Sequence, residues 1–155
     1  MKRFTSVKNF VVVCGTAVLL AACASGGSGG YSSNISAKEG TVKELVRNVG
    51  DRVFFVTDSA SLSSSARATI QKQADWLMSN RKSLTIQGHA DERGTRDYNL
   101  ALGARRANAV KDYMISLGVD PSRLATISYG KERPVSLCAE ESCWSKNRRS
   151  VSVIR

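Results

Sequence analysis

The alternation of apolar and polar residues after position 50 predicts a strand, a helix and a second strand. The β-branched and aromatic run Arg52–Val56 is typical of a strand. A helix is expected from Ser63 or Ser64 to about Ser79, because its apolar residues recur at three- and four-residue spacing. Apolar and polar positions then alternate over Ser83–His89, which is the period of a second strand.

The second half of the chain repeats this succession of strand and helix. Apolar residues at helical spacing predict a long helix over about Tyr98–Leu117, and a glycine follows it directly. Leu124–Tyr129 and Arg149–Ile154 are typical of two further strands, and Gly130–Lys146 between them is expected to be a loop. The predicted apolar face of the long helix consists of Leu100, Ala104, Ala107, Val110, Met114 and Leu117.

The order of these elements, β-α-β-α-β-β, predicts an α+β domain over residues 51–155. Two successive strand–helix–strand passages imply parallel pairing through right-handed crossovers. Both long helices should then cover one face of a mixed four-stranded sheet. A segment of roughly 105 residues is long enough to fold as an independent domain.

The first 22 residues have the features of a secretory signal peptide. A basic start precedes the apolar run Phe10–Leu20, which is too short to span a bilayer as a mature helix. The sequence Leu-Ala-Ala-Cys that ends at Cys23 resembles the lipobox of bacterial lipoproteins. This resemblance implies cleavage before Cys23 and acylation of that cysteine, which gives durable membrane attachment. With Ala24 as the next residue, it also implies the outer membrane.

Residues 23–50 are predicted to form a flexible linker between the lipid anchor and the domain. The stretch 24–40 is rich in Gly, Ser, Ala and Asn and has few apolar side chains to bury. Within the linker, Thr41–Val49 has the pattern of a short helix. Thr41 is its expected cap, and Glu44 is placed to complete a capping box.

The positive net charge indicates an anionic partner. The formal net charge is +10, and removal of residues 1–22 takes away three positive charges and no acid, which leaves +7. A nucleic acid partner would require a basic patch or a known binding module, and an exported protein does not meet DNA. Cell-wall polymers, lipid head groups and acidic proteins are the anionic partners that remain.

Cys138 and Cys143 are the two cysteines left after cleavage and acylation, because Cys14 leaves with the signal peptide. In an oxidising compartment this even pair predicts a disulfide across a short loop. A zinc site needs about four ligands, and the one histidine, His89, is distant in the sequence. We therefore expect neither a metal nor a cofactor.

The segment Gly88–Val110 concentrates acids, arginines and amides between a strand and a helix. Asp91 lies just past the strand end, and Arg106 lies about two turns into the helix that folds back over it. Such a pair suits a ligand with an ammonium and a carboxylate on one carbon, since arginine donates two parallel bonds to a carboxylate. Thr95 and Asn99 are available as neutral hydrogen-bonding groups. The residues alone leave a plain strand–helix ion pair open, which is a common arrangement.

The same segment carries a resemblance to a known family. The sequence GHADERGTRDYNLALGARRANAVKDYM at 88–114 resembles the signature of the OmpA-like peptidoglycan-binding domain family. The match continues through ISYGKERP at 127–134 and WSKNRR at 144–149. With the lipobox and the linker, the resemblance is to the lipid-anchored, peptidoglycan-associated members and covers nearly the whole chain.

This resemblance implies non-covalent binding of the meso-diaminopimelate side chain of the peptidoglycan stem peptide. It gives the contacts with the ammonium and the carboxylate to Asp91 and Arg106. It also places further residues around the same pocket, from the turn after the first strand, the helix and the Asn-Arg-Arg motif: Phe55, Asp58, Thr95, Asn99, Leu100 and Arg148.

The sequence departs from the family pattern at two places. The family's first strand usually reads Phe-Asp-x-Asp, whereas residues 55–58 read Phe-Val-Thr-Asp, so the first acid is replaced by Val56. This puts part of the contribution of the first strand in doubt. The pair Cys138 and Cys143 is not general among the lipid-anchored members.

The resemblance also implies a cellular role. It is that of an outer-membrane lipoprotein that links the membrane to the cell wall within the Tol-Pal system of envelope integrity and cell division, with TolB as a protein partner. One alternative is an adaptor whose main ligand is TolB, with wall binding secondary. Another is a basic domain that holds anionic polymers without specificity. No nucleophile–base–acid set is present, so we expect no enzyme activity.

Overall fold

The structure, a computed structural model, describes residues 40–155. The predictions for the signal peptide, the lipid-bearing Cys23 and the linker up to residue 39 lie outside the described residues. Within residues 40–155, no helix combines the length and the apolar character needed to cross a membrane.

Four strands form one mixed sheet in the order β1-β4-β2-β3. The strands are β1 (Arg52–Phe54), β2 (Leu84–His89), β3 (Leu124–Gly130) and β4 (Arg149–Ile154). β2 pairs in parallel with β3, and β4 pairs antiparallel with both β1 and β2. The predicted parallel pairing is therefore confirmed for β2 and β3. β1 runs in the same direction as β2, but β4 lies between them, so the first crossover does not join neighbouring strands.

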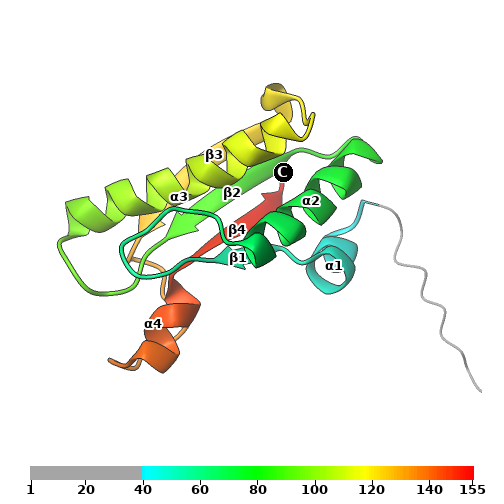
Figure 1. The fold of residues 1–155 in the computed structure, drawn as a ribbon. Coiled ribbons are helices and arrows are strands. Elements are labelled where there is room, and N and C mark those ends of the chain that lie inside the picture. Colours follow the sequence, from blue (N-terminus) through cyan, green and yellow to red (C-terminus); the bar gives the residue numbers. More distant parts are fainter. Residues whose placement is uncertain (1–39) are drawn as a thin grey trace, which may run out of the picture. The chain divides into compact units, whose positions relative to one another are not determined.

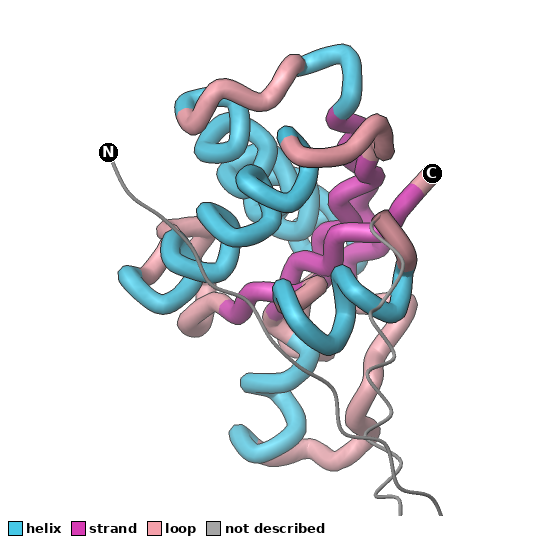
Figure 2. The backbone as a smooth tube through the Cα atoms, turned by 90° about the vertical axis from the view of Figure 1, so that its right-hand side faces the viewer, coloured by secondary structure: helices cyan, strands magenta, loops and turns pink. Residues whose placement is uncertain are grey.

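Two long helices, α2 (Ser64–Met78) and α3 (Arg96–Ser116), lie on the same face of this sheet (Figures 1 and 2). Side-chain caps fix their starts. The Ser63 hydroxyl accepts a bond from the Ala66 N–H at 3.1 Å, and the Thr95 hydroxyl accepts one from the Tyr98 N–H at 3.3 Å. The Thr95 cap explains why α3 begins two residues before the predicted start. The predicted fold class, an α+β domain with two helices on one face of a mixed sheet, is confirmed.

The core lies between the two helices and the inner face of the sheet. The spacing that predicted the helices also selects the residues that they bury, because positions three and four apart share one face. The central part of this core comes from α2, α3, β2 and β3: Ile70, Ala74, Leu77, Ala107, Val110, Met114, Leu84, Ile86 and Leu124.

The residues just before β1 belong to the folded unit, which corrects the predicted boundary at residue 51. The short helix α1 (Val42–Glu44) continues into a π-helical turn, η1 (Leu45–Val49). Thr41 caps α1 as predicted, and Glu44 accepts a bond from the Gly40 N–H at 2.7 Å. The side chain of Leu45 is only 1% exposed because it packs into the core. Burial of that side chain extends the folded part of the chain to Gly40.

A second correction concerns the predicted loop before the last strand. It contains a helix, α4 (Glu141–Asn147), which sits at the end of the sheet where β4 begins (Figure 1). Its seven residues are too few to show an apolar period, so the sequence pattern gave no signal. A short 3-10 turn, η2 (Pro121–Arg123), also precedes β3.

Two glycines set the distance between α3 and the sheet. A Cβ atom on Gly88 of β2 would lie 1.8 Å from the carbonyl oxygen of Gly103 on α3, and one on Gly103 would lie 2.9 Å from the Gly88 oxygen. The two backbones are therefore in direct contact, and no side chain fits between them. This contact fixes which residues of α3 face the end of β2.

We predict that Gly88→Ala destabilises the fold by about 2–3 kcal/mol, because the backbone of α3 must move away from β2. Chemical denaturation measures this loss. Asn108→Ala, at an exposed position of α3, is the matched control and should be neutral or slightly stabilising. Equal stability of the Gly88→Ala variant and the native chain would contradict the close contact.

His89, the last residue of β2, is buried without a hydrogen-bonding partner for its ring. The side chain is 2% exposed, and neither ring nitrogen has a partner. The ring lies 5.5 Å from that of Tyr129, and the positive charges of Arg149 and Arg133 act on it. Burial, followed by the two arginines, lowers the pKa of His89 to about 4. The imidazole is thus neutral at pH 7, as a structural histidine would be.

This histidine should make the fold sensitive to mild acid. Its pKa is about 4 when folded and about 6.5 when unfolded, so the unfolded chain binds more protons between these values. Stability is expected to fall by about 2 kcal/mol as the pH drops from 6.5 to 4. Denaturation midpoints across this range measure the slope. His89→Gln should flatten the profile, and an unchanged slope in that variant would rule out His89 as its cause.

Candidate functional site

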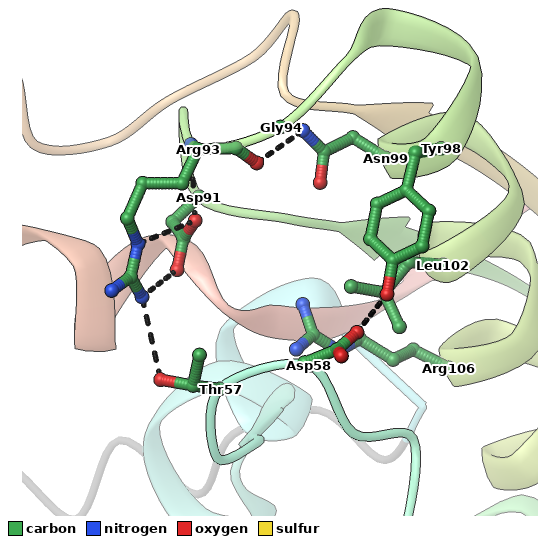
Figure 3. A pocket seen from close by; sticks show the side chains of 9 residues that line it. All are labelled: Thr57, Asp58, Asp91, Arg93, Gly94, Tyr98, Asn99, Leu102 and Arg106. Carbon is green, nitrogen blue, oxygen red and sulfur yellow. Dashed lines mark hydrogen bonds and ion pairs between the residues drawn. The ribbon is translucent and has the colours of Figure 1, made fainter.

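A cavity of about 290 Å³ opens where the end of β2 meets the first turns of α3 and the loop after β1. Figure 3 shows side chains from these three parts of the chain converging on it. Its lining is polar and charged on most sides: Thr57, Asp58, Asp91, Arg93, Gly94, Tyr98, Asn99, Leu102 and Arg106.

One face of α3 supplies three of these residues. Asn99, Leu102 and Arg106 are three and four residues apart, so they share the side of the helix that faces the cavity. Leu100 lies off that line, with its side chain 46% exposed, and it does not line the cavity. The contact of Leu100 with a ligand stays a prediction, and Leu102 lines the cavity.

The guanidinium of Arg106 is completely buried at the base of the site. It donates to three backbone carbonyls, those of Ser59 at 2.8 Å, His89 at 2.9 Å and Val56 at 3.1 Å. Burial lowers the pKa of Arg106 to about 10, so the group remains charged at pH 7. Three of its five N–H donors are used in these bonds, which leaves capacity for an anionic ligand.

The carboxylate of Asp91 is held by two other arginines. Arg93 donates to it at 2.7 Å from Nη2, and Arg148 donates from Nη1 at 3.2 Å. Burial by itself would raise the pKa of Asp91, but the hydrogen bonds from Arg93 and Arg148 outweigh it and lower that pKa. Asp91 is only 7% exposed, but because its pKa is lowered it is ionised, and it lines the cavity.

Asp91 and Arg106 thus face one cavity without pairing with each other. Arg106 donates its hydrogen bonds to backbone carbonyls, and Asp91 accepts hydrogen bonds from Arg93 and Arg148. In Figure 3 no dashed line joins Asp91 to Arg106. The alternative interpretation, a plain ion pair between strand and helix, is not present in the structure.

The loop after β1 closes the site from the other side. Asp58 lines the cavity and accepts a hydrogen bond from the Tyr98 hydroxyl. Its φ of +53° lies in the left-handed region, which aspartate tolerates better than most residues. Thr57 accepts a bond from Arg93 Nη2 at 3.3 Å. Phe55 lies behind the cavity, with its ring centroid 5.1 Å from the Arg106 guanidinium carbon.

The Asn-Arg-Arg motif joins this site to the segment before β4. Asn147 fixes the chain at residues 135–136 through bonds to both backbone N–H groups and to the Ser136 carbonyl. Arg148 is 5% exposed and donates to the Phe55 carbonyl at 3.0 Å, to Asp91 and to Glu141. The hydrogen bond with Glu141 raises the pKa of Arg148, although burial opposes it. Arg149 is buried below and bonds the Arg133 carbonyl.

The predicted disulfide is confirmed between Cys138 and Cys143, with the two Cα atoms 5.6 Å apart. The disulfide joins Cys138, in the loop that leads into α4, to Cys143, which belongs to that helix. Trp144, the next residue, donates from its indole to Glu92 at 2.9 Å, and its ring lies 4.1 Å from the Arg93 guanidinium carbon. α4 is therefore in contact with the loop that carries Asp91.

The structure places all but one of the predicted site residues in two groups. Four of them line the cavity: Asp58, Asp91, Asn99 and Arg106. Three others do not line the cavity but support it. The Phe55 carbonyl accepts a hydrogen bond from Arg148, and Thr95 caps α3. Leu100 is in neither group.

Sequence reasoning missed five lining residues: Thr57, Arg93, Gly94, Tyr98 and Leu102. Arg93, in the loop after β2, binds Asp91. For Leu102 a signal existed, since it is three residues after Asn99 and four before Arg106. For Thr57 and Tyr98 no local pattern gives the contact, because the two sides of the cavity are about forty residues apart in the chain.

The arrangement is suited to binding rather than to bond breaking. It offers one ionised carboxylate, a buried guanidinium with spare donors, and neutral oxygens and nitrogens from Thr57, Tyr98 and Asn99. Within residues 40–155, no cluster of three or more His, Cys, Asp or Glu side chains could hold a metal ion. The geometry fits a small ligand that carries both an ammonium and a carboxylate.

Comparison with known proteins shows the family of this chain. The chain matches the OmpA family over residues 54–148. It is 50% identical over 152 residues to the peptidoglycan-associated lipoprotein of Agrobacterium fabrum, covering 93% of this chain and 86% of the relative. It is 56% identical over 120 residues to the peptidoglycan-associated lipoprotein of Rhizobium meliloti, covering 77% of this chain and 68% of the relative.

A solved structure has the same fold. The crystal structure of the peptidoglycan-associated lipoprotein from Burkholderia pseudomallei is 42% identical in sequence, with a TM-score of 0.66. The match covers 68% of this chain and 90% of that one. The chain therefore belongs to the OmpA family.

Proposed function

We propose that this protein binds peptidoglycan without covalent chemistry, through the meso-diaminopimelate side chain of the stem peptide. Asp91 accepts hydrogen bonds from the ammonium of that side chain, and Arg106 donates to its carboxylate. Asp58, Tyr98 and Asn99 surround the ligand with further polar contacts. No bond in the ligand is broken, so the proposed activity is not enzymatic.

One observation carries this proposal: Asp91 and Arg106 line the same cavity, are both charged, and are not paired with each other. Two opposite charges that are not bonded to each other, at one small cavity, match a zwitterion in charge and in size. The names of the Agrobacterium and Rhizobium relatives favour peptidoglycan as the source of that zwitterion.

The cellular part of the proposal rests on the same relatives and on the N-terminal sequence. The protein is an outer-membrane lipoprotein, anchored through Cys23, whose periplasmic domain holds the cell wall. It acts within the Tol-Pal system in envelope integrity and cell division. The relatives' name, peptidoglycan-associated lipoprotein, supports the anchor and the wall partner together.

Removal of the charge on Asp91 should weaken wall binding by about tenfold or more, because a charge-assisted hydrogen bond to the ammonium is lost. Sedimentation of Asp91→Asn with purified diaminopimelate-containing sacculi measures this. Asp112→Asn removes the same charge from an exposed position near the other end of α3 and should bind normally. Native-like sedimentation of Asp91→Asn would refute the assigned site.

The companion variant at Arg106 needs a different measurement. Arg106→Ala leaves three buried carbonyls without a donor, so it is expected to destabilise the fold by about 3 kcal/mol or more, besides removing a ligand contact. For this reason Asp91→Asn, with Asn in place of a carboxylate of the same shape, is the cleaner test of binding.

The ligand itself can be changed instead of the protein. Sacculi that carry lysine in place of diaminopimelate keep the ammonium but lose the carboxylate that Arg106 would bind. We expect retention to fall by about tenfold on these sacculi. A basic domain that holds anionic polymers without specificity would bind both kinds equally and would lose both steeply as salt rises.

The second candidate function is an adaptor whose main ligand is TolB. Its support is one exposed apolar residue: Val56, next in the chain to the lining residue Thr57, is 69% exposed in place of the acid usual in the family. An exposed apolar side chain suits a protein partner better than a sugar polymer. Competition between a muropeptide and TolB for the purified domain separates the two functions.

A further inference from the structure

Helix α4 stands beside the ligand site without lining its cavity. It carries Glu141 and Trp144, and each contacts one of the two arginines that hold Asp91. Glu141 accepts hydrogen bonds from Arg148 at both carboxylate oxygens, and Trp144 stacks against Arg93 at 4.1 Å. Glu141 also lies 4.0 Å from Arg93. The helix therefore acts on the surroundings of Asp91 through both guanidinium groups.

The charges around Asp91 explain why this contact matters for a cationic ligand group. Asp91 with Arg93 and Arg148 is one acid between two bases, so this trio alone has a positive net charge and repels an ammonium. Glu141 supplies the missing negative charge at Arg148, the more deeply buried of the two arginines. The hydrogen bond from Arg148 lowers the pKa of Glu141, which keeps this carboxylate ionised.

We propose that Glu141, carried on the disulfide-closed α4, is a specificity determinant for the ammonium group of the ligand. It offsets the positive charge of Arg148, which donates to both Glu141 and Asp91, so that Asp91 can accept a cationic ligand group. Glu141 is a positioning residue that acts through Arg148, and it does not touch the ligand. This inference rests on the function proposed above and assigns the residue that sets the charge balance of its ammonium subsite.

Several contacts hold α4 in the position that this role requires. The Cys138–Cys143 disulfide closes the turn before the helix, the Trp144 indole bonds Glu92, and Asn147 bonds the backbone at 135–136. Glu141 is the first residue of the helix, three positions from Cys138, so the disulfide restrains the backbone from which its side chain extends. The side chain of Glu141 is itself 61% exposed, so little else holds it.

Two synthetic ligands test the proposal. One is the stem tripeptide with meso-diaminopimelate at its third position, and the other has 2-aminopimelate there, which keeps the side-chain carboxylate but lacks the ammonium. Glu141→Gln should weaken the first ligand about three- to tenfold and leave the second unchanged or tighter, as measured by calorimetry on the full domain. Glu140→Gln removes the same charge one residue earlier, where the side chain makes no cap hydrogen bond, and should change neither affinity.

The disulfide provides a second, independent measurement. Cys138→Ser with Cys143→Ser should also weaken the diaminopimelate ligand selectively, because Glu141 is less well placed. In the Glu141→Gln background the same pair should have almost no further effect, since both changes act through one residue. Additive losses for the two changes would overturn the proposed role of the disulfide-closed helix.

The outcomes at Glu141 and at Asp91 are distinguishable. If Asp91→Asn leaves the affinity for the diaminopimelate tripeptide unchanged, the proposed function fails. If Asp91→Asn weakens binding but Glu141→Gln does not, only the role of Glu141 is overturned. Equal weakening of both ligands by Glu141→Gln also overturns it, because a merely structural effect would not distinguish the ammonium.

Discussion

The buried guanidinium of Arg106 is the interaction on which the rest of the site depends. A charged group with no exposed surface needs partners for its donors, and here three carbonyls from the β1–α2 loop and the end of β2 provide them. Those bonds tie the loop, the strand and helix α3 together around one point. The same residue is both the support of the cavity and a source of unused donors inside it.

The charged groups around Arg106 leave a carboxylate and a guanidinium at the same cavity. Asp91 lies across the cavity and is held by Arg93 and Arg148 rather than by Arg106. The cavity therefore keeps a carboxylate and a guanidinium that do not neutralise each other, which is the condition for holding a zwitterion. A direct ion pair between them would have filled the site with its own bonds.

The close contact of Gly88 with Gly103 gives the site its dimensions. Because no side chain separates β2 from α3 there, the next residues of each element reach the same cavity: Asp91 beyond the strand, and Asn99, Leu102 and Arg106 on the helix. The segment 88–114 thus combines the residues that bring two backbones together with residues that line the cavity. Arg148 of the Asn-Arg-Arg motif donates to Asp91 and also to Glu141, so it connects Asp91 to α4.

The sequence by itself determined the elements of the fold and pointed to Asp91 and Arg106, two of the charged residues that line the cavity. Periodicity located both long helices and four strands. Burial of one face makes apolar residues recur every two residues in a strand and every three or four in a helix. The family resemblance identified Asp91 and Arg106 as site residues. Only the tertiary structure decided which groups pair with which. It paired Asp91 with Arg93 and Arg148 and brought α4 beside the site. The contacts with Arg148 and α4 join segments tens of residues apart, and no local pattern in the chain records such contacts.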